Sequence, residues 1–179
     1  LFPARITSWK GQLEFIDVIK KMDTQNILVL FAGDTKNKSY TKLVRDKIEQ
    51  NNLKRVCKIL GSVNQDEMRS LYQIADLSLS FPLRTEGFGR TVSESLYSKT
   101  PVLAFDYGGV KNQLANLSDM FKVKPQDFQV LPAKIEKLLS LSEVEKKEAL
   151  EGVQSVIESN FSKINMVNQY LKLYESFKF

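Results

Sequence analysis

Short apolar runs alternate with amphipathic stretches along the first two thirds of the chain, and this alternation constrains the fold more than any other feature. The runs are compact and apolar on both faces, which is typical of strands in a parallel sheet covered by helices. They occupy residues 3–7, 26–33, 55–61, 77–81, 101–106 and 120–124. Helical spacing of apolar residues marks the stretches 11–22, 40–51, 66–75, 89–98 and 109–114. This alternation, with its short links, predicts an α/β fold with a Rossmann-like, doubly wound parallel sheet.

The last third of the chain changes character and is helical throughout. From residue 125 onward the pattern gives helical segments at 131–141, 142–160 and 164–177. Ser142 and Glu145 have the spacing of a capping box, so we expect a helix to begin there. A length of 179 residues suits one domain with a proper core. We therefore predict that residues 1–179 form a single domain with extra helices at its C-terminal end.

The chain contains no histidine and only one cysteine, Cys57. The absence of histidine excludes imidazole metal sites and Ser-His or Cys-His nucleophiles within this sequence. A single cysteine excludes an internal disulfide. Cys57 lies within an apolar run, which is more typical of a small core residue than of a reactive thiol. Any chemistry of this chain therefore uses carboxylates, Lys, Arg and backbone amides, or groups supplied from elsewhere.

The formal net charge of +5 favours anionic partners such as nucleotides, phosphates or anionic lipid. Aromatic residues are not interleaved with a basic stripe and no nucleic-acid motif is present, so we expect no nucleic-acid partner. The longest apolar run, ILVLFA, is too short to span a bilayer, and the N-terminus does not resemble a signal peptide. The chain begins with Leu1 and leads directly into apparent structure, so we expect it to be a piece of a longer polypeptide.

Residues 84–96, RTEGFGRTVSESL, form the main candidate site because they follow a strand of the predicted parallel sheet, where such folds bind ligands. Gly87 and Gly89 allow the backbone to approach a ligand closely. The helix that follows offers unpaired N–H groups and a positive dipole end, which suit a phosphate or a sugar hydroxyl. Glu86 could face a bound sugar, and Glu94 could accept hydrogen bonds from a ribose diol.

Two further segments follow strands and are expected at the same edge. Arg5 and Lys10-Gly11 come after the first apolar run. Gly108-Gly109 comes after the fifth run. Taken singly, Lys10 is also explained as a solvated surface lysine, and Gly108-Gly109 as a plain turn before a helix.

Other interpretations of residues 84–96 stay open at this point. The helix dipole favours glutamates near a helix start, so the two glutamates alone are also explained structurally. Gly87 to Val92 partly matches the dinucleotide fingerprint G-x-G-x-x-G, with Asp106 placed about 20 residues further on. Val92 stands where that motif has its third glycine, and residues 81–86 make the turn longer than the motif requires, so this alternative is disfavoured.

Taken together, the segments resemble the C-terminal, donor-binding domain of the GT-B glycosyltransferases, and most closely that of the retaining family 4, also called group 1. Glu86 and Glu94 fit the E-x7-E motif of that family, written E-G-F-G-x-x-x-x-E. Arg5 and Lys10-Gly11 fit its upstream Arg and Lys-Gly. Further matching segments are LYQIAD at 71–76, TPV at 100–102, Gly108-Gly109 and the closing helix with a late tyrosine.

The resemblance implies a hexosyltransferase that transfers a glycosyl group from a nucleotide-diphosphate sugar with retention of configuration. UDP, GDP and ADP sugars are all used by relatives. By the resemblance, Arg5 and Lys10 supply positive charge to the leaving diphosphate, and Glu86 contacts the donor sugar. These three residues are the catalytic candidates.

The resemblance also assigns donor-binding residues. It places Glu94 on the ribose hydroxyls and the amides of Gly87, Phe88 and Gly89 beside the sugar, and the backbone around Val63 near the base. The chain has no D-x-D sequence, so we expect neither a metal nor another cofactor.

The family resemblance extends to the setting of the reaction. GT-B enzymes bind their acceptor in a second, N-terminal domain, which we expect to be missing from these 179 residues. We therefore expect the isolated domain to bind nucleotide but to transfer little or no sugar. The resemblance implies a sugar or lipid-linked acceptor in cell-envelope polysaccharide or lipid assembly, and a cytoplasmic location with peripheral contact at the inner face of a membrane. An NAD-type oxidoreductase domain and a noncatalytic nucleotide-binding module remain the alternatives.

Overall fold

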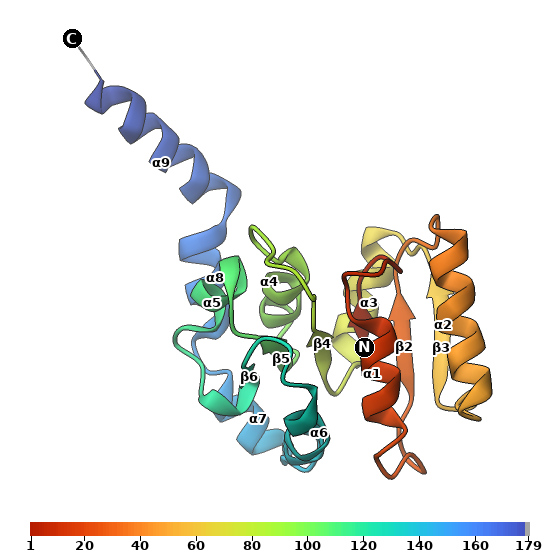
Figure 1. The fold of residues 1–179 in the computed structure, drawn as a ribbon. Helices are drawn as coiled ribbons and strands as arrows, with labels where there is room; N and C mark the ends of the chain where they lie inside the picture. Colours follow the sequence, from red (N-terminus) through yellow and green to blue (C-terminus); the bar gives the residue numbers. More distant parts are fainter. Residues whose placement is uncertain (178–179) are drawn as a thin grey trace.

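The computed structural model describes residues 1–177 and shows an α/β fold built on parallel strands (Figure 1). The strands of the first sheet are β1 (Phe2–Pro3), β2 (Val29–Ala32) and β3 (Cys57–Gly61), in the order β1-β2-β3. Those of the second sheet are β4 (Ser78–Ser80), β5 (Val102–Phe105) and β6 (Lys122–Val123), in the order β4-β5-β6. All pairings between neighbouring strands within these sheets are parallel.

The two sheets meet where β1 lies beside β4. The backbone N–H of Leu79 donates to the carbonyl of Leu1 at 2.9 Å, and the nitrogen of Leu1 donates to the carbonyl of Leu77 at 2.8 Å. The strands therefore follow the order β3-β2-β1-β4-β5-β6, with the direction of winding reversed between β1 and β4. This is the order of a doubly wound sheet, so the predicted fold class is confirmed.

Helices cover both faces of this sheet arrangement. Their bounds are α1 Gln12–Ile19, α2 Lys38–Gln50, α3 Gln65–Ile74, α4 Arg90–Tyr97, α5 Gly108–Leu114, α6 Leu131–Leu139, α7 Glu143–Ala149, α8 Val153–Phe161 and α9 Lys163–Ser176. Short 3₁₀ turns occupy Asp119–Phe121 and Phe128–Val130. Helix α1 contacts α2 and α6, whereas α4 contacts α3, α5 and α8. The two groups of helices are the two layers expected of a doubly wound fold.

A row of phenylalanines fills the core across the join between the sheets. Phe2 of β1 lies 5.4 Å from Phe15 of α1 and 5.4 Å from Phe31 of β2, measured between ring centroids. Phe81, directly after β4, lies 5.6 Å from Phe15 and 5.2 Å from Phe105 of β5. Each of these side chains is at most 1% exposed, and burying one contributes about 1.5–3 kcal/mol. The core therefore runs without interruption from the first sheet into the second.

The single cysteine belongs to the core, as the sequence predicts. Cys57 is 4% exposed on β3, and burial raises the pKa of its thiol to about 12. The thiol is therefore protonated at neutral pH, which is unfavourable for a nucleophile.

The first strand is shorter than the sequence predicts. Residues 3–7 were the expected strand, but β1 ends at Pro3 and the chain turns away. The carbonyl of Ala4 packs against Gly33, where an added Cβ would lie 2.1 Å from its oxygen, and the N–H of Ile6 donates to the carbonyl of Asp34. This close backbone contact after β2 replaces further strand pairing, so the residues that follow Ala4 form a loop at the sheet edge.

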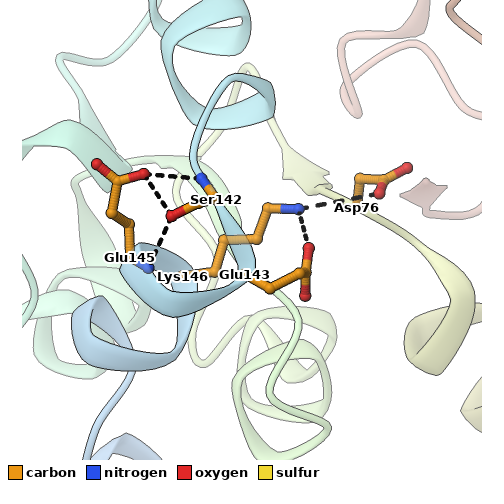
Figure 2. A network of polar contacts seen from close by, with 5 residues as sticks. All are labelled: Asp76, Ser142, Glu143, Glu145 and Lys146. Carbon is orange, nitrogen blue, oxygen red and sulfur yellow. Dashed lines mark hydrogen bonds and ion pairs between the residues drawn. The ribbon is translucent and has the colours of Figure 1, made fainter.

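The predicted helix at 142–160 is wrong in its extent, because it is divided into α7 and α8. Gly152, which precedes α8, has a φ of 72°, a left-handed conformation that interrupts a helix. The start of α7 is confirmed: the N–H of Ser142 donates to Glu145 Oε2 at 2.8 Å, and the N–H of Glu145 donates to Ser142 Oγ at 3.3 Å (Figure 2). Local capping chemistry therefore fixes where the helix begins, and a glycine fixes where it is divided.

Lys146 links α7 to the sheet. Its Nζ lies 2.7 Å from a carboxylate oxygen of Glu143 and 4.0 Å from one of Asp76, in the segment that leads into β4 (Figure 2). Asp76 and Glu143 are largely exposed, so this contact contributes little to stability.

The last helix, α9, projects away from the rest of the structure (Figure 1). None of its residues is buried, and many of its apolar side chains are among the most exposed of the chain. Within residues 1–177, no helix combines the length and the apolar character needed to cross a membrane.

Two glycine substitutions test how tightly the sheet edge is packed. Gly11 has a φ of 83°, and an added Cβ would lie 2.2 Å from the carbonyl oxygen of Phe81. Gly152 has a φ of 72°, but no atom of residues 1–177 outside its own neighbours lies within 4 Å of an added Cβ. We expect Gly11→Ala to lower the free energy of unfolding by about 3 kcal/mol or more, because a left-handed backbone and a steric clash both oppose it.

Gly152→Ala is the matched control and should cost only about 1–2 kcal/mol, since the backbone conformation alone opposes it. Urea denaturation followed by circular dichroism measures both values. Equal losses for the two variants would contradict the close packing of Gly11 against Phe81.

Candidate functional site

Two loops lie side by side at the carboxyl ends of β1 and β4, where the winding of the sheet reverses. They are residues 4–11 and residues 81–89, just above the strands in the view of Figure 1. The N–H of Leu83 donates to the carbonyl of Trp9 at 2.7 Å and ties the loops together. A doubly wound fold binds its ligands at this place.

The helices that begin from these loops have open N-terminal ends. Gly11 precedes α1 with a φ of 83°, and Gly89 precedes α4 with a φ of 80°. Neither helix end receives a hydrogen bond from a capping side chain. Their first N–H groups are therefore available to an anion, which the positive end of each helix dipole also favours.

Lys10 and Glu86 form an ion pair across the two loops. Lys10 Nζ donates to Glu86 Oε1, and the side chains are 13% and 12% exposed. The same ammonium nitrogen lies 4.3 Å from the centroid of the Trp9 ring. Within the described residues, the second carboxylate oxygen, Glu86 Oε2, is buried and accepts no hydrogen bond. The pair is thus largely removed from water, and Oε2 is an unsatisfied acceptor covered by the protein.

The backbone that carries Glu86 is packed directly against a pair of glycines. The N–H of Gly109 donates to the carbonyl of Glu86 at 3.0 Å. An added Cβ on Gly109 would lie 2.1 Å from the carbonyl oxygen of Gly87, and one on Gly108 would lie 2.6 Å from that of Glu86. Only a residue without a side chain fits there, so Gly108-Gly109 sets the position of the Glu86 loop.

Two side chains that the sequence analysis did not identify hold the same loop, one from α5 and one from the residue that precedes it. Gln113, which is buried, donates from Nε2 to the carbonyl of Phe88, and its Oε1 accepts from Ser93 Oγ at 2.6 Å. Tyr107 donates its hydroxyl to the carbonyl of Pro82, and burial and the charge of Glu86 raise its pKa. No local pattern distinguishes these residues, because their partners lie 20 to 25 positions away in the sequence.

Arg5 lies in the first loop and is exposed. Its carbonyl accepts a hydrogen bond of 2.8 Å from Nε2 of Gln12, a fully buried residue at the start of α1. Its guanidinium makes no hydrogen bond or ion pair with any other residue between positions 1 and 177. The loop is therefore anchored through the backbone, and the charged group stays available.

Glu94 contacts a different residue, Tyr72, and Val63 packs against the cluster to which Tyr72 belongs. Glu94 is exposed on the second turn of α4, and its Oε2 accepts a hydrogen bond of 3.0 Å from the Tyr72 hydroxyl. Val63, which follows β3, packs partly buried against the small cluster formed by Leu1, Ala32 and Tyr72. The sequence analysis used Tyr72 only as part of a motif and missed this contact.

The predicted site residues thus form two groups. Lys10, Glu86 and the residues after Glu86 meet at the join of the loops, whereas Glu94 contacts Tyr72 and Val63 packs against the cluster that contains Tyr72. In the part of the chain that the structure describes, no three His, Cys, Asp or Glu side chains lie together as metal ligands would. The groups available for binding or catalysis are therefore a shielded carboxylate, basic side chains and open helix ends.

Comparisons with known proteins give a consistent picture. The model of the family "Glycosyl transferases group 1" matches residues 1–151. The trehalose synthase of Thermococcus litoralis is 29% identical over 183 residues, covering 97% of this chain and 43% of that protein.

Two solved structures have the same fold. A glycosyltransferase from Rickettsia africae superposes with a TM-score of 0.88 at 28% identity, covering 98% of this chain and 46% of that one. Anabaena HepE, solved in complex with UDP-glucose, superposes with a TM-score of 0.85 at 22% identity, covering 98% and 48%. This chain therefore spans a little less than half the length of these relatives.

The Lys10–Glu86 pair should behave as a shielded ion pair. We expect Lys10→Met to lower the free energy of unfolding by about 3 kcal/mol, because it leaves Glu86 charged and unpaired. The double variant Lys10→Met/Glu86→Leu should recover at least half of that loss, since both charges are then removed.

The exposed pair Lys54–Glu49, with side chains 66% and 62% exposed, provides the control. Lys54→Met should cost less than about 1 kcal/mol. Urea denaturation of the unsubstituted chain and the three variants measures these free energies of unfolding. A loss for Lys10→Met no larger than that for Lys54→Met would contradict the shielding.

Proposed function

Because the chain belongs to the group 1 glycosyl transferases, we propose that it is the donor-binding half of a retaining hexosyltransferase and binds a nucleotide-diphosphate sugar between loops 4–11 and 81–89. The observation that carries this proposal is the shielded Lys10–Glu86 pair, which lies where the sheet winding reverses, beside the open end of α4. In that arrangement the Glu86 carboxylate can bind a sugar, and Lys10 and the helix end can bind a diphosphate.

The basic groups act on the leaving diphosphate. Sugar transfer expels a nucleoside diphosphate, so negative charge grows on its phosphate oxygens in the transition state and must be stabilised. Arg5, whose guanidinium is uncommitted, grips a phosphate through two parallel hydrogen bonds, whereas Lys10 acts as a point charge. The open N–H groups at the start of α4 add to this stabilisation.

Glu86 acts on the donor sugar. Its carboxylate accepts a sugar hydroxyl while Oε1 stays paired with Lys10. The same negative charge stabilises the oxocarbenium-like character that the sugar gains as the leaving group departs. The amides of Gly87, Phe88 and Gly89 bind beside it, on a loop that Gly108-Gly109 and Gln113 hold in place.

Glu94 accepts the ribose hydroxyls, and the backbone around Val63 lies near the base. Glu94 contacts Tyr72, and Val63 packs against the cluster that contains Tyr72, which supports a common nucleoside site. HepE, which has the same fold, was solved with UDP-glucose, so a UDP sugar is the first donor to test. GDP and ADP sugars remain the other candidates.

The acceptor half is proposed to lie outside these 179 residues. This chain spans a little less than half of its relatives, which supports a second domain that completes the cleft. On this proposal the chain alone binds nucleotide but transfers little or no sugar, and full activity towards a sugar or lipid-linked acceptor needs both halves. A cytoplasmic location and peripheral contact at the inner face of a membrane stay predictions.

The alternative NAD-type domain finds little support in the geometry. Its fingerprint requires a tight turn after the first strand, whereas residues 81–89 form a long loop after β4. A noncatalytic nucleotide-binding module would share the same donor contacts.

Calorimetric titration of the chain with UDP, GDP, ADP and NAD, without metal, tests the proposed function. We expect one nucleoside diphosphate to bind and NAD not to bind. Glu94→Ala and Lys10→Ala should each weaken that binding about tenfold or more, because each removes a charged hydrogen-bonding group. Lys54→Ala, in an exposed pair away from both loops, should leave the affinity unchanged.

Circular dichroism confirms that each variant is folded before titration. Binding of NAD alone would overturn the proposal in favour of the dinucleotide alternative. Binding of a nucleoside diphosphate that neither Glu94→Ala nor Lys10→Ala weakens would overturn the assigned site.

A further inference from the structure

Tyr72 is a buried tyrosine whose hydroxyl donates a hydrogen bond to the carboxylate of an exposed residue, Glu94. It is 2% exposed and is the buried residue of α3. Its hydroxyl donates to Glu94 Oε2 at 3.0 Å, across to α4. A tyrosine has a single O–H donor, so this contact takes its whole donor capacity.

The position of Tyr72 is fixed by α4 and the strand that follows it. Thr100, which is 3% exposed and lies between α4 and β5, donates from Oγ1 to the carbonyl of Tyr72 at 2.6 Å. The carbonyl of Thr100 in turn accepts from Oγ of Ser95, the neighbour of Glu94 on α4, at 3.2 Å. The tyrosine is therefore held through its backbone by the same segment that its hydroxyl contacts.

This support determines how Glu94 is presented. A glutamate on an exposed helix face samples several rotamers, and ordering it on ligand binding costs conformational entropy. Tyr72 holds Oε2 of a glutamate that is otherwise exposed to solvent. Burial and the charge of Glu94 both raise the pKa of Tyr72, so its hydroxyl remains a donor at every pH at which the protein is used.

We propose that Tyr72 is a positioning residue that holds the Glu94 carboxylate in the orientation that accepts the ribose diol of the nucleotide. The inference rests on the proposed function, because it assigns a role to Tyr72 at the same nucleotide site. It goes beyond that function in naming what makes Glu94 competent to bind.

A purely structural role for the hydroxyl is the competing explanation, since buried polar groups generally need a partner. The two roles differ in their dependence on the ribose hydroxyls. A structural defect weakens every nucleotide alike, whereas a mispositioned Glu94 weakens only nucleotides that carry the diol.

The test titrates UDP and 2′,3′-dideoxy-UDP into the 179-residue chain and into Tyr72→Phe. We expect Tyr72→Phe to weaken UDP about tenfold, as for a lost hydrogen bond to a charged group, and dideoxy-UDP less than about twofold. Tyr40→Phe is the matched control, because Tyr40 is also buried but lies on α2, and it should change neither affinity.

Two further variants keep the test decisive. In a Glu94→Ala background, Tyr72→Phe should have no additional effect on UDP, because the tyrosine acts through the carboxylate. Thr100→Val, which keeps the tyrosine hydroxyl but removes the bond to its backbone, should produce a smaller loss that again requires the diol. This variant serves if Tyr72→Phe does not fold, as judged by its melting curve.

The outcomes distinguish a failure of the positioning role of Tyr72 from a failure of the proposed function. If the unsubstituted chain binds UDP and Tyr72→Phe weakens UDP and dideoxy-UDP equally, or weakens neither, the positioning role is overturned and the proposed function stands. If the unsubstituted chain binds none of UDP, GDP and ADP, the proposed function is overturned and the role of Tyr72 with it.

Discussion

The placement of β1 beside β4 is the contact on which the rest of this structure depends. Two backbone hydrogen bonds between Leu1 and the Leu77–Leu79 segment, one donated by each side, join the sheets, and the row of phenylalanines packs across that join. Only this pairing brings loop 4–11 next to loop 81–89, so that Lys10 reaches Glu86 over a separation of 76 residues. The candidate site is thus a direct consequence of strand order.

The N-terminal ends of the helices differ in whether a side chain caps them. Helices α2, α3, α7 and α9 begin with Asn or Ser side chains that accept a backbone N–H. Helices α1 and α4, which begin at the site, start from left-handed glycines without such a cap. An uncapped helix end is less stable, and a ligand that accepts those N–H groups offsets the loss. At the site this loss adds to that of the unpartnered Oε2 of Glu86, whereas α8, which begins elsewhere, also starts from an uncapped left-handed glycine.

Much of the fold could be predicted from the sequence because its signals are local. Strand and helix periods, the capping box of Ser142 and Glu145 and the burial of Cys57 all follow from neighbouring residues. One error arises where a distant contact overrides the local pattern, and the other at a single glycine within an otherwise helical pattern. Gly33 draws the backbone of Ala4 out of the expected first strand, and the left-handed Gly152 divides an apparently continuous helix.

For the candidate site, the sequence by itself determined which residue types are present: carboxylates, basic groups and glycines after strands, and no histidine. It could not determine their partners. That Glu86 pairs with Lys10, that Gly109 packs on Gly87, and that Glu94 accepts from Tyr72 were decided only by the tertiary structure. The physical reason is that spacing along a chain fixes which residues share one strand or helix face, whereas contacts between elements depend on the order of the strands and the packing of the core.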